Sequence, residues 1–117
     1  MKKTLTFLLL LLLPFIPVKA QWSNNPAINT IICNLSGEQA IPKVAVCPDG
    51  SYYIGYFSNE SSNYNVRLQR LDAQGNILWA SNGILISNNQ QDTWLTDWDM
   101  TADQSNHAIL AHRGAVA

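Results

Sequence analysis

The chain has 117 residues, of which 47% are hydrophobic and 13% are charged, and its formal net charge is −1 at pH 7. This length fits one small domain, and the low content of basic residues argues against nucleic acid and anionic membrane surfaces as partners. The polar positions are mostly Asn, Gln, Ser and Thr, a composition that fits an exported β protein better than a helical one.

The N-terminus has the pattern of a signal peptide over residues 1–20. Lys2 and Lys3 precede the apolar run Leu5–Leu13, and Val18 and Ala20 place small residues at a cleavage site. The run is shorter than the roughly 20 apolar residues that a membrane-spanning helix needs. We expect cleavage after Ala20, which would give a secreted, periplasmic or cell-surface protein without a membrane anchor. The alternative is that the segment stays uncleaved and anchors the protein in the membrane. Cleavage leaves four basic and eight acidic residues, so the net charge becomes 4 − 8 = −4.

The remaining residues 21–117 predict an all-β, antiparallel fold. No window keeps apolar residues at helical spacing, and the short runs rich in Ile, Val, Tyr and Trp are separated by Gly, Pro, Asn and Asp. Tight turns are expected at residues 48–50 and 72–75. The expected strands are residues 28–32, 41–46, 52–57, 66–71, 76–79, 84–86, 98–101 and 107–111.

The pattern of side chains along two strands predicts how they are covered. Tyr52–Phe57 is apolar on both faces, which indicates a strand packed on both sides. Arg67 and Gln69 give the strand at residues 66–71 one polar face, which places it further out.

The chain also matches itself weakly at a period near 55. Trp22–Asn25 and Trp79–Asn82 both carry Trp and Asn three residues apart, and the two Trp are separated by 79 − 22 = 57 residues. Asp49 matches Asp103, at a distance of 103 − 49 = 54 residues. Such periodicity is typical of stacked β repeats.

Three runs carry a family resemblance: P-K-V-A-V-C-P-D-G-S-Y-Y-I-G-Y-F-S, N-V-R-L-Q-R-L-D-A-Q-G-N-I-L-W and N-G-I-L-I-S. Together they resemble blades of secreted bacterial β-propeller-like repeat proteins, which often carry a type IX secretion C-terminal sorting domain that is absent here. The resemblance covers about Trp22 to Ala111 and implies four-stranded antiparallel blades. We expect one full blade over residues 41–86, the start of a second over residues 93–112, and a fragment of a larger repeat protein.

One cluster suggests a possible glycan contact. Tryptophan rings stack on sugars and carboxylates accept sugar hydroxyls, and the cluster comprises Trp94, Asp97, Trp98 and Asp99. The alternative is a strand with core tryptophans and solvated acids. The two carboxylates are two residues apart on one strand, whereas glycoside hydrolysis needs carboxylates on both sides of the scissile bond. We expect no catalytic residues, no cofactor and no metal site.

The chain has two cysteines, Cys33 and Cys47. In an exported protein they could form one disulfide that closes a loop of about 15 residues and contributes roughly 3 kcal/mol. Two unpaired thiols in neighbouring strands are the equal alternative.

The sequence therefore predicts an exported, non-catalytic repeat segment that acts as a scaffold or as a glycan- or protein-binding part of a larger surface or secreted protein. Two alternatives stay open: the N-terminal remnant of a propeller glycoside hydrolase, and a short secreted protein that self-associates. The expected partners are the remaining blades of a parent protein or a second copy of the chain. A glycan or a surface protein is a further expected partner.

Overall fold

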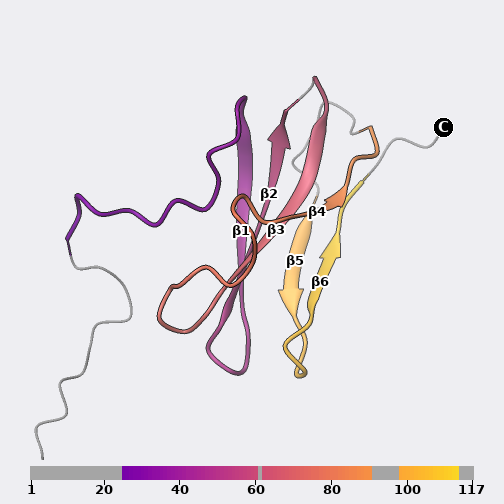
Figure 1. Ribbon diagram of the computed structural model, residues 1–117. Helices are drawn as coiled ribbons and strands as arrows, with labels where there is room; N and C mark the ends of the chain where they lie inside the picture. Colours follow the sequence, from indigo (N-terminus) through magenta and orange to yellow (C-terminus); the bar gives the residue numbers. More distant parts are fainter. Residues whose placement is uncertain (1–24, 61, 91–97, 114–117) are drawn as a thin grey trace, which may run out of the picture.

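Six strands build the part of the chain that the computed structural model describes, namely residues 25–60, 62–90 and 98–113 (Figure 1). They form a four-stranded antiparallel sheet in the order β1-β2-β3-β4 and a separate hairpin of β5 and β6. The predicted all-β, antiparallel class is confirmed. The strands are β1 (Gln39–Val46), β2 (Tyr52–Asn59), β3 (Tyr64–Leu71), β4 (Ile84–Ser87), β5 (Asp99–Ala102) and β6 (Ala108–Ala111).

The predicted signal peptide at residues 1–20 lies outside the described residues. Within the described ranges, no helix is long and apolar enough to span a membrane.

Three five-residue turns of the same kind fold the strands back: Cys47–Ser51, Asp72–Asn76 and Asp103–His107. In each turn the first N–H donates to the fifth carbonyl and the fourth N–H donates to the first carbonyl. The fourth residue has a positive φ, 82° at Gly50, 82° at Gly75 and 64° at Asn106. Glycine and asparagine tolerate this conformation best, which explains why these sequences turn here. The turns expected at residues 48–50 and 72–75 are confirmed.

Two expected strands are absent. Residues 28–32 form no strand, and after the Asp72 turn only Ile77 makes an isolated bridge, to Leu71. The expected strand at residues 76–79 therefore pairs with β3 through one further backbone bond only, from the Leu78 N–H to the Arg70 carbonyl at 2.8 Å. The chain then turns at residues 80–83 and returns as β4, which takes the place beside β3.

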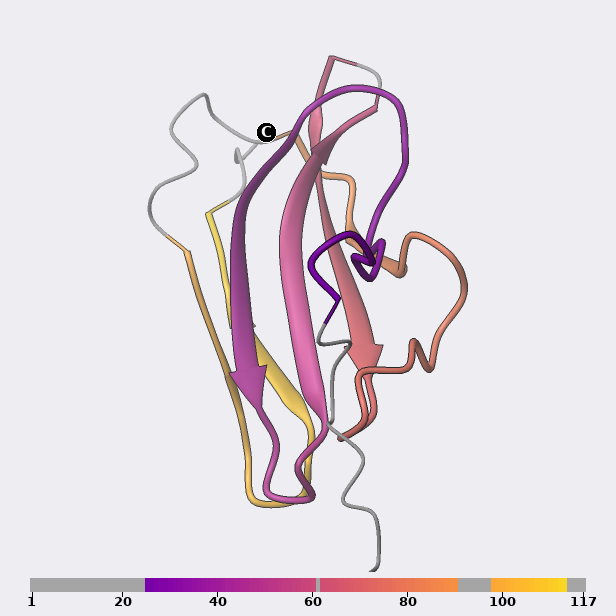
Figure 2. The same cartoon turned by 90° about the vertical axis from the view of Figure 1, so that its left-hand side faces the viewer.

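The β5–β6 hairpin packs against one face of the sheet, which we call the front face (Figure 2). The buried core lies between these two layers. Its members are Ala45, Cys47, Tyr53, Phe57, Val66, Leu68, Trp98 and Met100.

Gly55 makes this close packing possible. A Cβ at this position would lie 2.9 Å from Cη2 of Trp98 and 3.1 Å from Sδ of Met100. The missing side chain in β2 thus leaves the space that the Trp98 ring fills. This close approach of the two layers is a common reason for glycine inside a strand.

Residues 28–34 and 80–83 lie on the opposite side of the sheet, which we call the back face (Figure 2), whereas Trp79 packs against the front-face core beside Tyr53. The two segments are joined where the Asn34 N–H donates to Oδ1 of Asn82 at 2.7 Å. The sheet is therefore covered on both sides at β2, as the two-sided apolar pattern of Tyr52–Phe57 predicts. Tyr53, Tyr56 and Phe57 are buried.

The prediction that the strand at residues 66–71 lies further out is wrong. β3 is an inner strand between β2 and β4, and Gln69 is fully buried. Its Nε2 donates to the Ala80 carbonyl at 2.9 Å and its Oε1 accepts the Arg70 N–H at 2.9 Å. Because both ends of the amide are hydrogen-bonded, a polar side chain can occupy this buried position.

Candidate functional site

Trp98, one of the predicted glycan contacts, is part of the core. Its side chain is 5% exposed, and its ring meets the Phe57 ring edge-on, with centroids 5.3 Å apart and an interplanar angle of 81°. Lys43 Nζ lies 5.7 Å from the Trp98 ring centroid. A buried ring cannot stack on a sugar, so the structure supports the alternative of a core tryptophan at this position.

Asp99 is the predicted contact that reaches the surface, with a side chain 83% exposed. Its Oδ1 accepts the Met100 N–H at 2.9 Å and a bond from Lys43 Nζ at 3.4 Å. These two bonds hold the pKa of the Asp99 carboxyl below its usual value. Trp94 and Asp97 lie outside the described residues, so the structure does not bring the four predicted glycan contacts together.

The two cysteines are free thiols, and no disulfide joins Cys33 to Cys47. Cys47 belongs to the front-face core, 3% exposed, whereas Cys33 lines a hollow on the back face. The sheet therefore lies between them, and a disulfide would need their Cα atoms within about 7 Å. Both thiols are free in the structure, and Cys33 lies outside the six strands, so the two cysteines do not lie in neighbouring strands.

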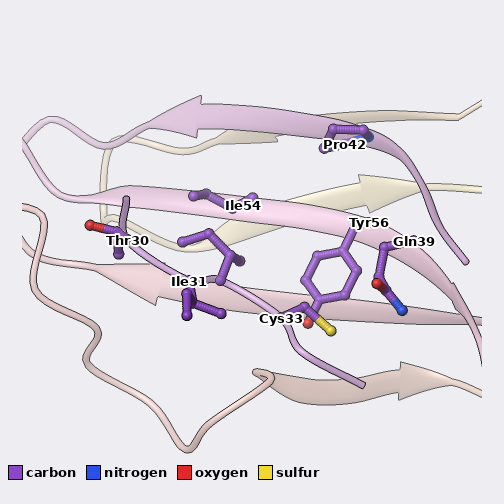
Figure 3. Close-up of a pocket in the computed structure, with 8 residues that line it drawn as sticks. Thr30, Ile31, Cys33, Gln39, Pro42, Ile54 and Tyr56 are labelled. Carbon is purple, nitrogen blue, oxygen red and sulfur yellow. The ribbon is translucent and has the colours of Figure 1, made fainter. Parts of the chain in front are cut away.

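Cys33 lines a hollow on the back face (Figure 3). Its volume is about 390 Å³, and it lies between the segment at residues 30–33 and the strands β1 and β2. The wall is mostly apolar. The lining residues are Thr30, Ile31, Ile32, Cys33, Gln39, Pro42, Ile54 and Tyr56.

Tyr56 lines this hollow and points from β2 toward Cys33 (Figure 3). Its hydroxyl donates to the Asn82 carbonyl at 2.7 Å. Burial raises the pKa of the Tyr56 phenol far above its usual 10.0, and the neighbouring Cys33 thiol raises it further. The phenol therefore stays neutral and acts as a structural donor.

A strained residue directly precedes Pro42, one of the residues that line the hollow. Ile41 has a φ of +48° at the bulge between Ala40 and Lys43, directly before Pro42. A β-branched residue at positive φ is an outlier, and such residues persist where the surrounding structure holds them and gather at functional positions. Sequence reasoning missed this site, because its residues meet only through the fold. The two-sided apolar pattern of Tyr52–Phe57 was the one signal that a second segment covers this face.

The turn acids have structural partners. Asp72 Oδ1 accepts the N–H groups of Gln74 and Asn76 at 2.9 and 2.8 Å, and its Oδ2 accepts Asn76 Nδ2 at 2.8 Å. Asp103 accepts the Ser105 and His107 N–H groups in the same way. These bonds lower the pKa of both carboxyls, so the charged form caps the turn.

Within the described residues, no group of three or more His, Cys, Asp or Glu side chains is placed to hold a metal ion. Comparisons with models of protein families, with curated proteins and with solved structures gave no match to the chain.

Proposed function

We propose that the chain is an exported, non-catalytic segment of a β-propeller-like repeat scaffold, which acts by packing sheet on sheet and by binding other proteins. The observation that carries this proposal is that the second hairpin repeats the first. Val46 pairs with Tyr52 next to the turn of the first hairpin, and Ala102 pairs with Ala108 next to the turn of the second hairpin. Each strand of the second hairpin thus follows the equivalent strand of the first by the same number of residues, 102 − 46 = 108 − 52 = 56.

The turns agree with this spacing. Gly50 and Asn106 are the fourth residues of their turns, both have a positive φ, and they are also 106 − 50 = 56 residues apart. The expected match of Asp49 with Asp103 is therefore wrong by two residues, and Asp49 corresponds to Ser105. The equivalent hairpins also lie one on the other, with their turns in contact through a bond from the Asp49 N–H to Asn106 Oδ1 at 3.1 Å.

The order of the four-stranded sheet supports a blade-like unit. β1 to β4 follow one another in space as in sequence, which is the arrangement of strands in a propeller blade. The blade expected over residues 41–86 would correspond to β1–β4, and the second unit would begin with β5. Export rests on the signal-peptide pattern at residues 1–20.

Binding is favoured over catalysis by what the surface offers. Four large apolar side chains are between 59% and 66% exposed on the β1 strand and the segment beside it, namely Ile28, Ile31, Val44 and Val46. Exposed apolar clusters of this kind mark interaction surfaces. Among the described residues of the predicted glycan cluster, Asp99 alone is accessible and lacks an exposed ring beside it, so a protein partner fits this surface better than a sugar.

Two measurements test the proposal. Nuclear Overhauser effects between the Trp98 ring and the Gly55 and Phe57 protons should be present, because the proposal requires the hairpin to stack on the sheet. Their absence from an otherwise folded chain would refute the stacked units. Incubation with chromogenic glycosides should give no hydrolysis. Turnover that Asp99→Asn abolishes would replace the proposal with the glycoside hydrolase alternative.

A further inference from the structure

We propose that a second copy of the chain binds head to tail, with its β5–β6 hairpin on the back face of β1. This inference names the partner of the proposed repeat scaffold and rests on that proposal. The docking surface is the apolar back side of β1 around Val44 and Val46. The surface that it receives is the outer side of the second hairpin, formed by Thr101, Ile109 and Ala111.

The 56-residue relation shows what the first hairpin lacks. The inner side of the second hairpin packs against the core through Met100, Ala102, Ala108 and Leu110. The equivalent residues of the first hairpin are Val44, Val46, Tyr52 and Ile54. Val44 and Val46 are 59% and 62% exposed, although their equivalents Met100 and Ala102 are covered. In β1 the first hairpin therefore presents to solvent the side that β5 buries, whereas in β2 the same side borders the segment at residues 30–33.

The second hairpin shows the complementary situation. Its outer residues Thr101 and Ile109 are equivalent to Ala45 and Tyr53, both of which are 5% exposed beneath β5–β6. Ile109, in contrast, is 53% exposed. The exposed back side of β1 and the exposed outer side of β5–β6 are thus each equivalent to a surface that is covered between the two layers, and together they could form the same kind of contact.

Charge supports the match. Lys43 and Asp99 occupy equivalent positions, and Lys43 Nζ lies 3.4 Å from Asp99 Oδ1 across the layers of one molecule. When the same stacking step continues into a second copy, Asp99 meets Lys43 of that copy. Opposite charges therefore meet at every step, and the exposed Asp99 carboxylate has room for the second lysine.

Side-chain size supports it too. Inside the molecule, the glycine at position 55 receives the large Trp98 ring. The equivalent contact between copies brings Ala111 of one copy against Pro42 of the other. Ala111 is slightly larger than its equivalent Gly55, and Pro42 is much smaller than its equivalent Trp98, so the two side chains have room to meet. A shallow hollow of about 110 Å³, lined in part by Thr101, Ile109 and Ala111, lies where this contact would form.

The back face leaves space for the partner. Residues 30–33 line the hollow beside β2, while the valines of β1 stay exposed beyond this segment. A docked hairpin would lie next to this segment and cover β1. Because two different surfaces meet, one of each remains free in a dimer, and association continues into longer assemblies unless a ring closes.

Sedimentation velocity of the purified chain, up to about 1 mM, tests the proposal, since contacts of this size give weak association. We expect concentration-dependent species larger than a dimer. Val44→Asp removes the back face and Ile109→Asp removes the hairpin face, and each alone should weaken association at least about tenfold. Ile84→Asp is the matched control, because Ile84 is 42% exposed on β4 outside both surfaces, and should leave association unchanged.

Mixing the two variants gives the decisive result. Each retains the surface that the other lacks, so an equimolar mixture should form a heterodimer and nothing larger. A wild-type chain that stays monomeric at all concentrations, or a mixture that stays monomeric while wild type associates, overturns the head-to-tail contact. Far-UV circular dichroism shows that the variants are folded. A monomer that keeps the Trp98–Gly55 contact would leave the proposed function intact, which separates the two failures.

Discussion

Replacing Gly55 with alanine probes the contact between the two layers. The added Cβ would lie 2.9 Å from Trp98 Cη2, 3.1 Å from Trp98 Cζ3 and 3.1 Å from Met100 Sδ. Carbon atoms in favourable contact are about 3.5–4.0 Å apart, so the methyl group overlaps the ring by about 0.5–1 Å. The ring cannot move aside easily, because Phe57 packs against it and it is buried in the core between the sheet and the β5–β6 hairpin.

Two effects of opposite sign decide the magnitude. Alanine in place of glycine inside a strand contributes about 0.5–1 kcal/mol by restricting the unfolded chain. Overpacking a core typically costs about 1–3 kcal/mol. Overpacking wins at this distance, so we expect Gly55→Ala to lower the free energy of unfolding by about 1–2 kcal/mol. With a urea m-value of about 1 kcal/mol/M, the midpoint falls by about 1–2 M.

A double-mutant cycle in urea, followed by circular dichroism, isolates the contact. Trp98→Phe removes the ring atoms that meet the new Cβ, so the double variant should be more stable than the sum of the single effects by about 1 kcal/mol. Gln74→Ala is the control, because Gln74 is exposed in the Asp72–Asn76 turn, away from Gly55 and Trp98. It should show no coupling to Trp98→Phe. A stabilised Gly55→Ala variant, or no coupling to Trp98→Phe, would refute the close packing of the hairpin.

Three further outcomes are expected from the turns, the phenol and the thiols. The hydrogen bonds of the turn lower the pKa of Asp72 below its usual 3.8, so its contribution to stability is present above that pH and is lost as pH falls through the lowered value. Asp72→Ala should reduce stability at pH 7 and flatten its acid dependence in urea titrations; an unchanged acid slope would contradict the capping role. Because burial raises the pKa of Tyr56 above 10.0, stability should fall as pH rises beyond 10, and Tyr56→Phe should remove the latest component of the phenolate absorbance titration. Ellman's reagent should modify Cys33 in the native chain and reach Cys47, 3% exposed, on unfolding, so that Cys33→Ser loses the native reaction.

Local sequence signals predicted most of the sheet. Runs of aromatic and β-branched residues between tight turns identified the six strands to within about two residues at most ends, because turn chemistry depends on neighbours in the chain. Residues 28–32 carry the same apolar signal but gain no strand partner. Strand pairing depends on a partner strand that is distant in the sequence, so the local pattern of residues cannot show that such a partner is missing.

The burial of polar and aromatic side chains was harder to predict, because it depends on contacts across the fold. Gln69 looks like a solvent-facing residue until the Ala80 carbonyl, 11 residues later, accepts its amide. Trp98 looks like a ligand-stacking ring until Gly55 opens a space for it. In both cases the deciding partner is a backbone carbonyl or a missing side chain, which a pattern of apolar and polar residues does not contain.

The exposed faces also set how strongly two copies can bind. A fully buried Val or Ile side chain contributes about 1.5–3 kcal/mol, and Val44, Val46 and Ile109 are each little more than half exposed, so covering them contributes about 2–5 kcal/mol. Loss of translational and rotational freedom on association opposes this by about 4–15 kcal/mol. Separate copies therefore need the Lys43–Asp99 pair and backbone contacts to associate at all, and do so weakly. Units linked in one polypeptide lose far less freedom, since a short linker supplies a millimolar effective concentration. The contact should therefore tighten markedly when two copies are fused in tandem, and an untethered and a fused pair of equal affinity would show that these faces do not meet.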